Sequence, residues 1–230
     1  MNIPDKLLID VEKTNNVAGY PIISKDGKEI QYVISGKMII SVSENDHKNK
    51  IYNLLEENCD LFFCTSEKMD DFLFYPVPML AIFAVDSKGN RFGTIGYMGG
   101  FGSDNYPIGY INQEGVYGKI SSSFKEFLEL VTYFPYWRNI VEYEQTEVAY
   151  NLADIEMKKR EKNSQFYANQ REISETLELS KNPKSIELLI SNIKSPPDFV
   201  VYSSINEVKK ENTFVEDIFV EWKGTYSSTE

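Results

Sequence analysis

The chain has 230 residues, of which 42% are hydrophobic and 13% aromatic, so it can bury a sizeable core and is not a disordered segment. Its net charge of −11 argues against direct binding to nucleic acid and favours a basic partner, although solubility alone is an equally good reason for an acidic surface. The longest strongly apolar run, 79–85, is too short to cross a membrane and the start lacks a secretory signal, so we expect a cytoplasmic protein that binds no membrane.

The first part of the chain carries the signals of β-strands. Two β-rich runs flank Asp26-Gly27, which predicts a hairpin. Gly36 and Lys37 predict a second tight turn, and a single strand with a bulge at Gly36 is the alternative.

Helical patterns follow these strands. Residues 43–58 predict a short helix with Ile51, Leu54 and Leu55 on one face. Residues 66–74 are a weaker helical candidate.

The centre of the chain predicts a series of strands that ends in a helix. Prolines precede the continuous apolar run 79–85, which is typical of a strand buried on both faces. Two further turns, D-S-K-G-N and N-Q-E-G, separate the strands that follow. Ser123 and Glu126 have the spacing of a capping box at the start of a helix.

The part of the chain after Tyr136 is more highly charged and keeps only a thin apolar stripe. The run KKREK at 158–162 is typical of a solvated helical face. Asn182 and Pro183 predict the start of a short helix, and a proline-rich turn then leads into a strand. We expect residues 144–230 to form a helical extension on a core of residues 1–143.

The glycine-rich stretch 93–111 has the composition of a phosphate-binding loop but not its pattern. Gly100 and Gly102 precede a proline-containing strand rather than a helix, and no G-K-[ST] follows them. The glycines therefore predict turns, bulges and close approach of strands.

The histidine and cysteine residues give little indication of a metal-binding site or of a catalytic nucleophile. The chain has one histidine, His47, and its two cysteines, Cys59 and Cys64, lie in an apolar, acid-flanked stretch with a spacing atypical for zinc. We interpret both cysteines as buried thiols, on opposite faces if the segment is a strand. Asp70 and Asp71 do not select an acid/base pair, so no catalytic residue, metal or cofactor is predicted.

Residues from about 75 to 130 show a recognisable order of motifs. The segments are YPVPMLAIFAVDSKGN, RFGTIGY, YPIGYI and VYGKISSSFKEFLELV. The residues that match the pattern are Asp86, Gly89, Asn90, Pro107, Ser123, Phe124, Glu126, Phe127 and Leu128. In this order they resemble the SUKH superfamily, which groups fungal cell-wall-synthesis regulators with bacterial immunity proteins. The N-terminal strands depart from the family pattern, which usually starts with a helix.

The resemblance implies an α+β fold, with helices packed on an antiparallel-rich mixed sheet, and a protein that binds another protein and catalyses nothing. Bacterial members typically block the active site of a toxin, and the acidic balance suits a basic toxin such as a nuclease. A housekeeping scaffold or regulator of the same fold is the alternative, followed by a carboxylate-based hydrolase. For the protein-binding face we select Tyr97, Phe101, Asp104 and Tyr106, because tyrosines beside an acidic residue are suited to the centre of an interface. A role in packing and turn formation is an equally good interpretation of these residues.

Overall fold

The computed structural model describes residues 6–12, 31–68, 71–96, 106–159, 164–196 and 198–211. The strands in this part of the chain are β1 (Lys6–Asp10), β2 (Gln31–Ser35), β3 (Lys37–Ile39), β4 (Phe62–Phe63), β5 (Tyr75–Val77), β6 (Leu80–Val85), β7 (Arg91–Ile95), β8 (Ile108–Ile111), β9 (Tyr117–Ser121) and β10 (Val200–Tyr202). The helices are α1 (Glu44–His47), α2 (Lys50–Cys59), α3 (Phe124–Tyr133), α4 (Trp137–Gln145), α5 (Leu152–Lys159), α6 (Ser164–Thr176), α7 (Ser185–Lys194) and α8 (Ile205–Glu211). None of the helices described is long and apolar enough to cross a membrane.

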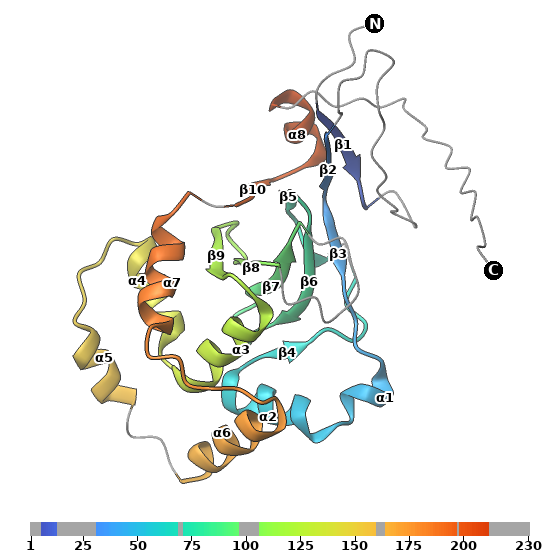
Figure 1. Cartoon of the computed structure of the whole chain (residues 1–230). Coiled ribbons are helices and arrows are strands. Elements are labelled where there is room, and N and C mark those ends of the chain that lie inside the picture. Colours follow the sequence, from blue (N-terminus) through green and yellow to red (C-terminus); the bar gives the residue numbers. More distant parts are fainter. Residues whose placement is uncertain are drawn as a thin grey trace, which may run out of the picture.

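A mixed, mostly antiparallel sheet forms the centre of the fold (Figure 1). Its strands run in the order β3-β6-β7-β8-β9, and β4 also pairs with β6. Neighbours are antiparallel except for β3, which is parallel to β6. Strand β6 is buried on both faces, as its continuous apolar run predicts. The predicted α+β class with an antiparallel-rich mixed sheet is therefore confirmed.

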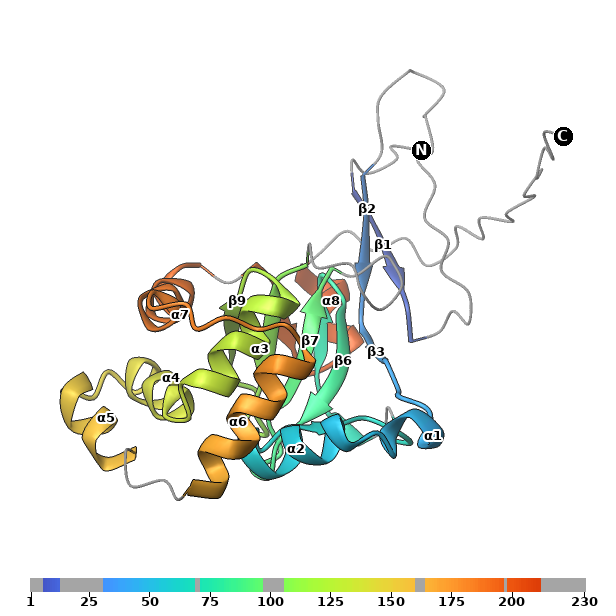
Figure 2. The ribbon, with the colours of Figure 1, turned by 60° about the horizontal axis from the view of Figure 1, so that its bottom comes forward.

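Helices cover one face of this sheet and enclose the larger core (Figures 1 and 2). Phe83 and Phe92 point from β6 and β7 to this side, where they pack against Phe127 of α3, and Phe92 also contacts Trp137 of α4. Helix α6 contacts α2 and α3, while α7 contacts α4 and β9. Residues beyond the predicted boundary at 143 thus contribute directly to the core.

On the opposite face of the sheet, the described residues that form the core lie outside the helices. Phe72, Phe74 and Phe199 pack there with alternate residues of β6, β7 and β8. Phe199 precedes β10, which pairs antiparallel with β5. The C-terminal part of the chain therefore packs on both faces of the sheet, as α6 and α7 on one and as Phe199 on the other.

The tight turn predicted at Gly36 and Lys37 is wrong. Strand β2 pairs in parallel with β1, and β3 pairs in parallel with β6, so β2 and β3 do not form a hairpin with each other. Gly36 has a φ of +98° and is the residue at which the chain passes from one sheet to the other. The turn predicted at Asp26-Gly27 lies outside the described residues.

Local helix signals are confirmed where capping and an apolar stripe coincide. Residues 44–59 form α1 and α2, with Ile51, Leu54 and Leu55 buried. The Ser123 hydroxyl accepts from the Glu126 N–H at 3.1 Å, as the capping box predicts. Helix α7 begins at Ser185 rather than at Pro183, since Asn182 and Pro183 form a preceding turn.

The weak helix prediction at 66–74 is wrong for the residues of this segment that the structure describes. Phe72 and Phe74 lie against the sheet, and the guanidinium of Arg91 is 4.8 Å from the Phe72 ring centroid. Residues 72–74 belong to no helix, and the Phe74 N–H donates to the Phe72 carbonyl at 2.9 Å in a tight turn that leaves Leu73 between them exposed. The conformation of this segment is therefore determined by tertiary packing against the sheet rather than by its local helix propensity.

The glycine-rich stretch forms strands where the structure describes it. Gly93 of β7 faces Gly109 of β8, and residues 97–105 lie outside the described part. A Cβ atom on Gly93 would lie 2.6 Å from the Ala81 carbonyl oxygen, so this glycine permits close approach of β6. The interpretation of these glycines as strand and turn residues is confirmed at the described positions.

Candidate functional site

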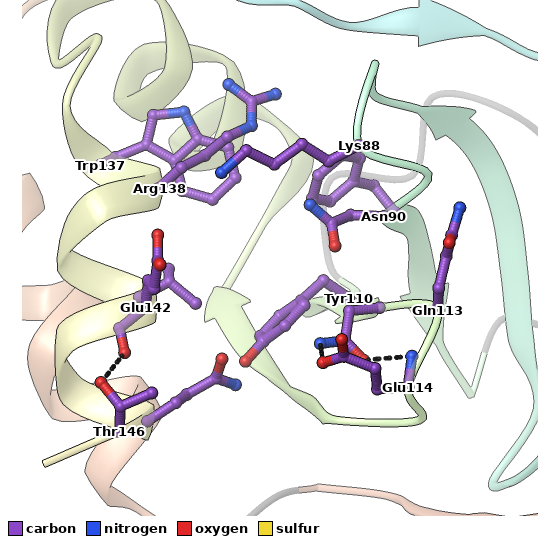
Figure 3. A pocket seen from close by; sticks show the side chains of 13 residues that line it. Lys88, Asn90, Tyr110, Gln113, Glu114, Trp137, Arg138, Glu142 and Thr146 are labelled. Atoms are coloured by element: carbon purple, nitrogen blue, oxygen red, sulfur yellow. Dashed lines mark hydrogen bonds between the residues drawn. The ribbon is translucent and has the colours of Figure 1, made fainter.

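A polar pocket of about 390 Å³ lies at one end of the sheet, between two strand connections and α4 (Figure 3). The connections are the turn at 86–90, between β6 and β7, and the turn at 112–116, between β8 and β9. The pocket is lined by Lys88, Asn90, Phe92, Tyr110, Asn112, Gln113, Glu114, Trp137, Arg138, Val141, Glu142, Gln145 and Thr146. We call it the polar pocket.

The first turn is held by the side chain of Asp86. Its Oδ1 accepts from the N–H groups of Lys88 and Asn90 at 3.0 and 2.9 Å, and its Oδ2 accepts from Asn90 Nδ2 at 2.9 Å. Gly89 has a φ of +77°, which favours glycine. The D-S-K-G-N sequence thus fixes Lys88 and Asn90 at the edge of the pocket.

The second turn is built in the same way around Asn112. Its side-chain oxygen accepts from the N–H groups of Glu114 and Val116 at 3.0 and 2.8 Å. Gly115 has a φ of +83°. A Cβ on Gly89 would lie 2.1 Å from the amide nitrogen of Gln113, so the two turns lie side by side.

Arg138 of α4 joins the first turn to the end of α2. Its Nε donates to Asp86 Oδ2 at 2.9 Å, while its two terminal nitrogens donate to the carbonyls of Cys59 and Asp60 at 3.0 and 2.8 Å. The Asp86 side chain is fully buried. The guanidinium also lies 4.5 Å from the ring centroid of Trp137. Arg138 therefore acts as a structural anchor for the pocket.

Two residues of the pocket wall each carry a buried polar atom for which the structure shows no hydrogen-bond partner. They are the Tyr110 hydroxyl and Trp137 Nε1. Burial raises the pKa of the Tyr110 hydroxyl, so this group stays protonated and keeps its donor. Leaving such groups unpaired is unfavourable by about 1–3 kcal/mol each. A polar group that enters the pocket, after a small movement of the lining side chains, would relieve that penalty.

The chemistry of the polar pocket is that of hydrogen bonding. Side-chain amides of Asn90, Gln113 and Gln145 offer both donors and acceptors. Glu142 on α4 and Glu114 on the second turn lie on opposite sides of the opening (Figure 3). Such a lining suits peptide groups and polar side chains of another molecule.

The thiols lie apart from this pocket and from each other. Cys59 at the end of α2 belongs to the core under the helices, and Cys64 belongs to the core on the other face of the sheet. Desolvation by burial raises the pKa of each thiol to about 12. Both are buried core residues, as the sequence predicts.

The single histidine stacks on a neighbouring aromatic ring. His47 is the last residue of α1, and its ring stacks on that of Tyr52 with centroids 5.4 Å apart. Among the described residues, no three or more His, Cys, Asp or Glu side chains are grouped as metal ligands.

Of the four predicted protein-binding residues, Tyr106 is described, and it lies at the other end of the sheet from the polar pocket. Tyr97, Phe101 and Asp104 are outside the described residues. Tyr106 is half-buried just before β8. Since strand direction alternates along β6, β7 and β8, the connection that holds Tyr106 is opposite the turns at 86–90 and 112–116. This binding face stays a prediction.

Sequence reasoning recognised both turns but not the pocket between them. The order of the strands could have indicated the pocket. In an antiparallel series β6, β7, β8 and β9, the turn between β6 and β7 and the turn between β8 and β9 lie at the same end of the sheet. Arg138 gives no such signal, since its partners are 52, 78 and 79 residues away in sequence.

Comparisons with known proteins found no matching family model and no significant match to a curated protein or a solved structure. The resemblance to the SUKH superfamily stays a prediction from the sequence.

Proposed function

We propose that this chain is a non-enzymatic, cytoplasmic binding protein that neutralises a basic toxin domain, such as a nuclease, by covering its active site. The observation that carries the proposal is the charge: 35 acidic residues stand against 24 basic ones, for a net charge of −11. A nuclease binds phosphates through a basic cleft, and an acidic inhibitor is attracted to the same cleft.

The polar pocket supports a binding role at one end of the sheet. Its opening has the exposed carboxylates of Glu114 and Glu142 with the single exposed lysine Lys88, while the charge of Arg138 is balanced by Asp86. Its amide side chains provide the hydrogen bonds that interfaces between proteins commonly contain.

Glu144 and the two thiols do not have the pKa shifts that catalysis by these groups would need. Partial burial opposes ionisation of Glu144, but hydrogen bonds from Tyr150 and Lys194 outweigh it and lower the pKa of this carboxyl group. A general acid at neutral pH needs the opposite shift. With both thiols at a pKa of about 12, the described residues offer no activated nucleophile of the cysteine type.

The decisive experiment pairs the chain with a toxin domain encoded beside its gene. Cells that express the toxin should survive only when the chain is expressed with it. The association rate constant of the purified pair should fall about tenfold or more between about 50 mM and about 500 mM NaCl. Survival without any effect of salt, or an acidic partner, would contradict the electrostatic basis of the proposal.

The same experiment separates the alternatives. A scaffold or regulator of the same fold would bind a partner without rescuing cells from a toxin. A hydrolase would inactivate the toxin or its product catalytically, so trace amounts of the chain would protect. An inhibitor protects only at a stoichiometric ratio, which titration of the two purified proteins measures directly.

A further inference from the structure

A second pocket, of about 340 Å³, lies where the junction of α3 and α4 meets α5 and α6. Its walls are rich in aromatic rings and include one carboxylate. The residues that the argument uses are Tyr133, Phe134, Tyr136, Glu156, Phe166 and Tyr167. We call it the aromatic pocket. Its volume falls within the range of pockets that hold small ligands.

The rings are held in place by contacts within the fold. Phe134 and Tyr136 pack edge to face, with centroids 6.1 Å apart and an interplanar angle of 87°. Phe166 and Tyr167 form a second such pair at 5.5 Å and 87°. The Tyr133 hydroxyl donates to the Leu179 carbonyl at 3.2 Å. The wall of the pocket therefore combines two nearly buried rings, Phe134 and Tyr136, with the more accessible rings of Phe166 and Tyr167.

The carboxylate of Glu156 places one negative charge in the wall of the aromatic pocket, and Lys181 places one positive charge at its edge. One oxygen of Glu156 accepts from the Tyr136 hydroxyl at 2.5 Å. A carboxylate has room for several donors, so this contact fixes the group without using all of its acceptor capacity. A fixed carboxylate next to aromatic faces is the combination that attracts an organic cation.

The chain itself shows that the wall attracts a cation. The ammonium nitrogen of Lys181 lies 5.5 Å from the ring centroid of Phe134. Lys181 is exposed at the edge of the pocket, and the space of about 340 Å³ is present with its side chain in place. A second cation can therefore enter from outside.

We propose that the aromatic pocket receives an arginine side chain of the basic partner, with the guanidinium stacked on the rings and paired with Glu156. The inference rests on the proposed function, which supplies a basic partner. Arginine fits better than lysine because its planar guanidinium stacks on aromatic rings and is more weakly hydrated than an ammonium group. Arginine is also enriched among the residues that dominate protein interfaces.

The test uses a single-arginine peptide, Ac-Gly-Arg-Gly-amide, titrated into the full chain and followed by the NMR signals of the aromatic side chains. The matched probe carries citrulline, which has the shape of arginine without the charge. We expect shifts of the Phe166 and Tyr167 signals with the arginine peptide and at least about threefold weaker binding of the citrulline peptide. Equal binding of both probes, or no shift with either, overturns the proposal.

Two variants and a matched control locate the site. Glu156→Gln keeps an oxygen that can accept from Tyr136 and should weaken the arginine peptide about threefold to fivefold. Tyr167→Leu keeps an apolar side chain without a ring and should weaken it about twofold to fivefold. Glu187→Gln removes the same charge at an exposed position of α7 that lines neither pocket, and it should leave the affinity unchanged. An equal loss in Glu187→Gln would assign the effect to net charge and contradict the proposal.

Binding of the toxin to the Glu156→Gln variant tests this inference separately from the proposed function. If the toxin still binds Glu156→Gln as tightly as the parent and binding still weakens with salt, the proposed function stands and the arginine site falls. If the peptide binds the aromatic pocket but no basic toxin is neutralised, the site stands as a cation site and the proposed function falls. Lys181→Gln should tighten peptide binding, because it removes a competing cation from the Phe134 ring.

Discussion

Arg138 shows how one side chain can determine the geometry of a site that it does not serve chemically. Its three donor nitrogens bind Asp86 and the carbonyls of Cys59 and Asp60, so α4, the first turn and the end of α2 are held together. A buried charge is tolerated when it is paired and hydrogen-bonded, and it becomes strongly destabilising when its partner is lost.

Arg138→Met should therefore lower the free energy of unfolding by about 3–5 kcal/mol, because it leaves the Asp86 carboxylate buried without its cation. Urea denaturation followed by circular dichroism measures this value. Asp86→Asn in the same chain should recover part of the loss, since an amide oxygen can still accept from the turn N–H groups without a charge. A double variant no more stable than Arg138→Met would show that the charge is not the cause.

Glu144 provides a test through pH. Its folded-state pKa is lowered, because hydrogen bonds from Tyr150 and Lys194 outweigh the effect of partial burial. A carboxyl group with a lowered pKa contributes stability above its unfolded-state pKa and loses it as the pH falls through the folded-state pKa. The difference in stability between the parent and Glu144→Gln should be largest near pH 7 and shrink below about pH 4.5. Denaturation across this range measures it, and a difference that grows on acidification would contradict the assignment.

At the scale of elements, close packing of strands explains the small residues of β7 and β8. Gly93 and Gly109 face each other, and a Cβ on Gly109 would lie 3.0 Å from the side chains of Ile95 and Phe199. The missing side chain is thus replaced by Phe199 from the C-terminal part of the chain. Glycine has a low propensity for strand interiors, so its presence at position 109 is explained by the contact with Phe199.

Gly93→Ala should lower the free energy of unfolding by about 1–3 kcal/mol, because the new Cβ meets the Ala81 carbonyl of the neighbouring strand backbone. Gly115→Ala is the matched control: it has a φ of +83° but nothing within 4 Å, so only backbone strain of about 1 kcal/mol is expected. Chemical denaturation of the two variants compares crowding with strain. A smaller effect at Gly93 than at Gly115 would contradict the close-approach explanation.

Elements whose stability is local were predictable from the sequence, whereas those decided by distant partners were not. Ser123 caps α3 through a residue three positions away, so its pattern is visible locally. Gly36 has the same local signals as a hairpin turn, but β2 and β3 each find a parallel partner elsewhere. Parallel pairing requires a long connection, and a short sequence window contains no information on it.

At the scale of the whole molecule, the alternation of strand direction places the connections of the sheet at two opposite ends. The turns at 86–90 and 112–116 frame the polar pocket at one end, and the connection that includes Tyr106 lies at the other. The sequence could indicate the turns and the acidic balance, but the pocket also requires α4, whose place is set by the long-range contacts of Arg138. A candidate site of this kind can be assembled only after the fold is known.

Charge reversal at each end separately identifies the one that meets a basic partner. Glu114→Lys with Glu142→Lys changes the net charge from −11 by four units at the polar pocket. If this end faces the partner, the association rate constant should fall by about tenfold or more at low salt, because steering acts locally and over about 10 Å at 0.1 M salt. Asp104→Lys with Tyr106→Ala tests the predicted protein-binding residues. Stopped-flow association measures both, and equal, small losses in the two variants would show that neither end is the contact surface.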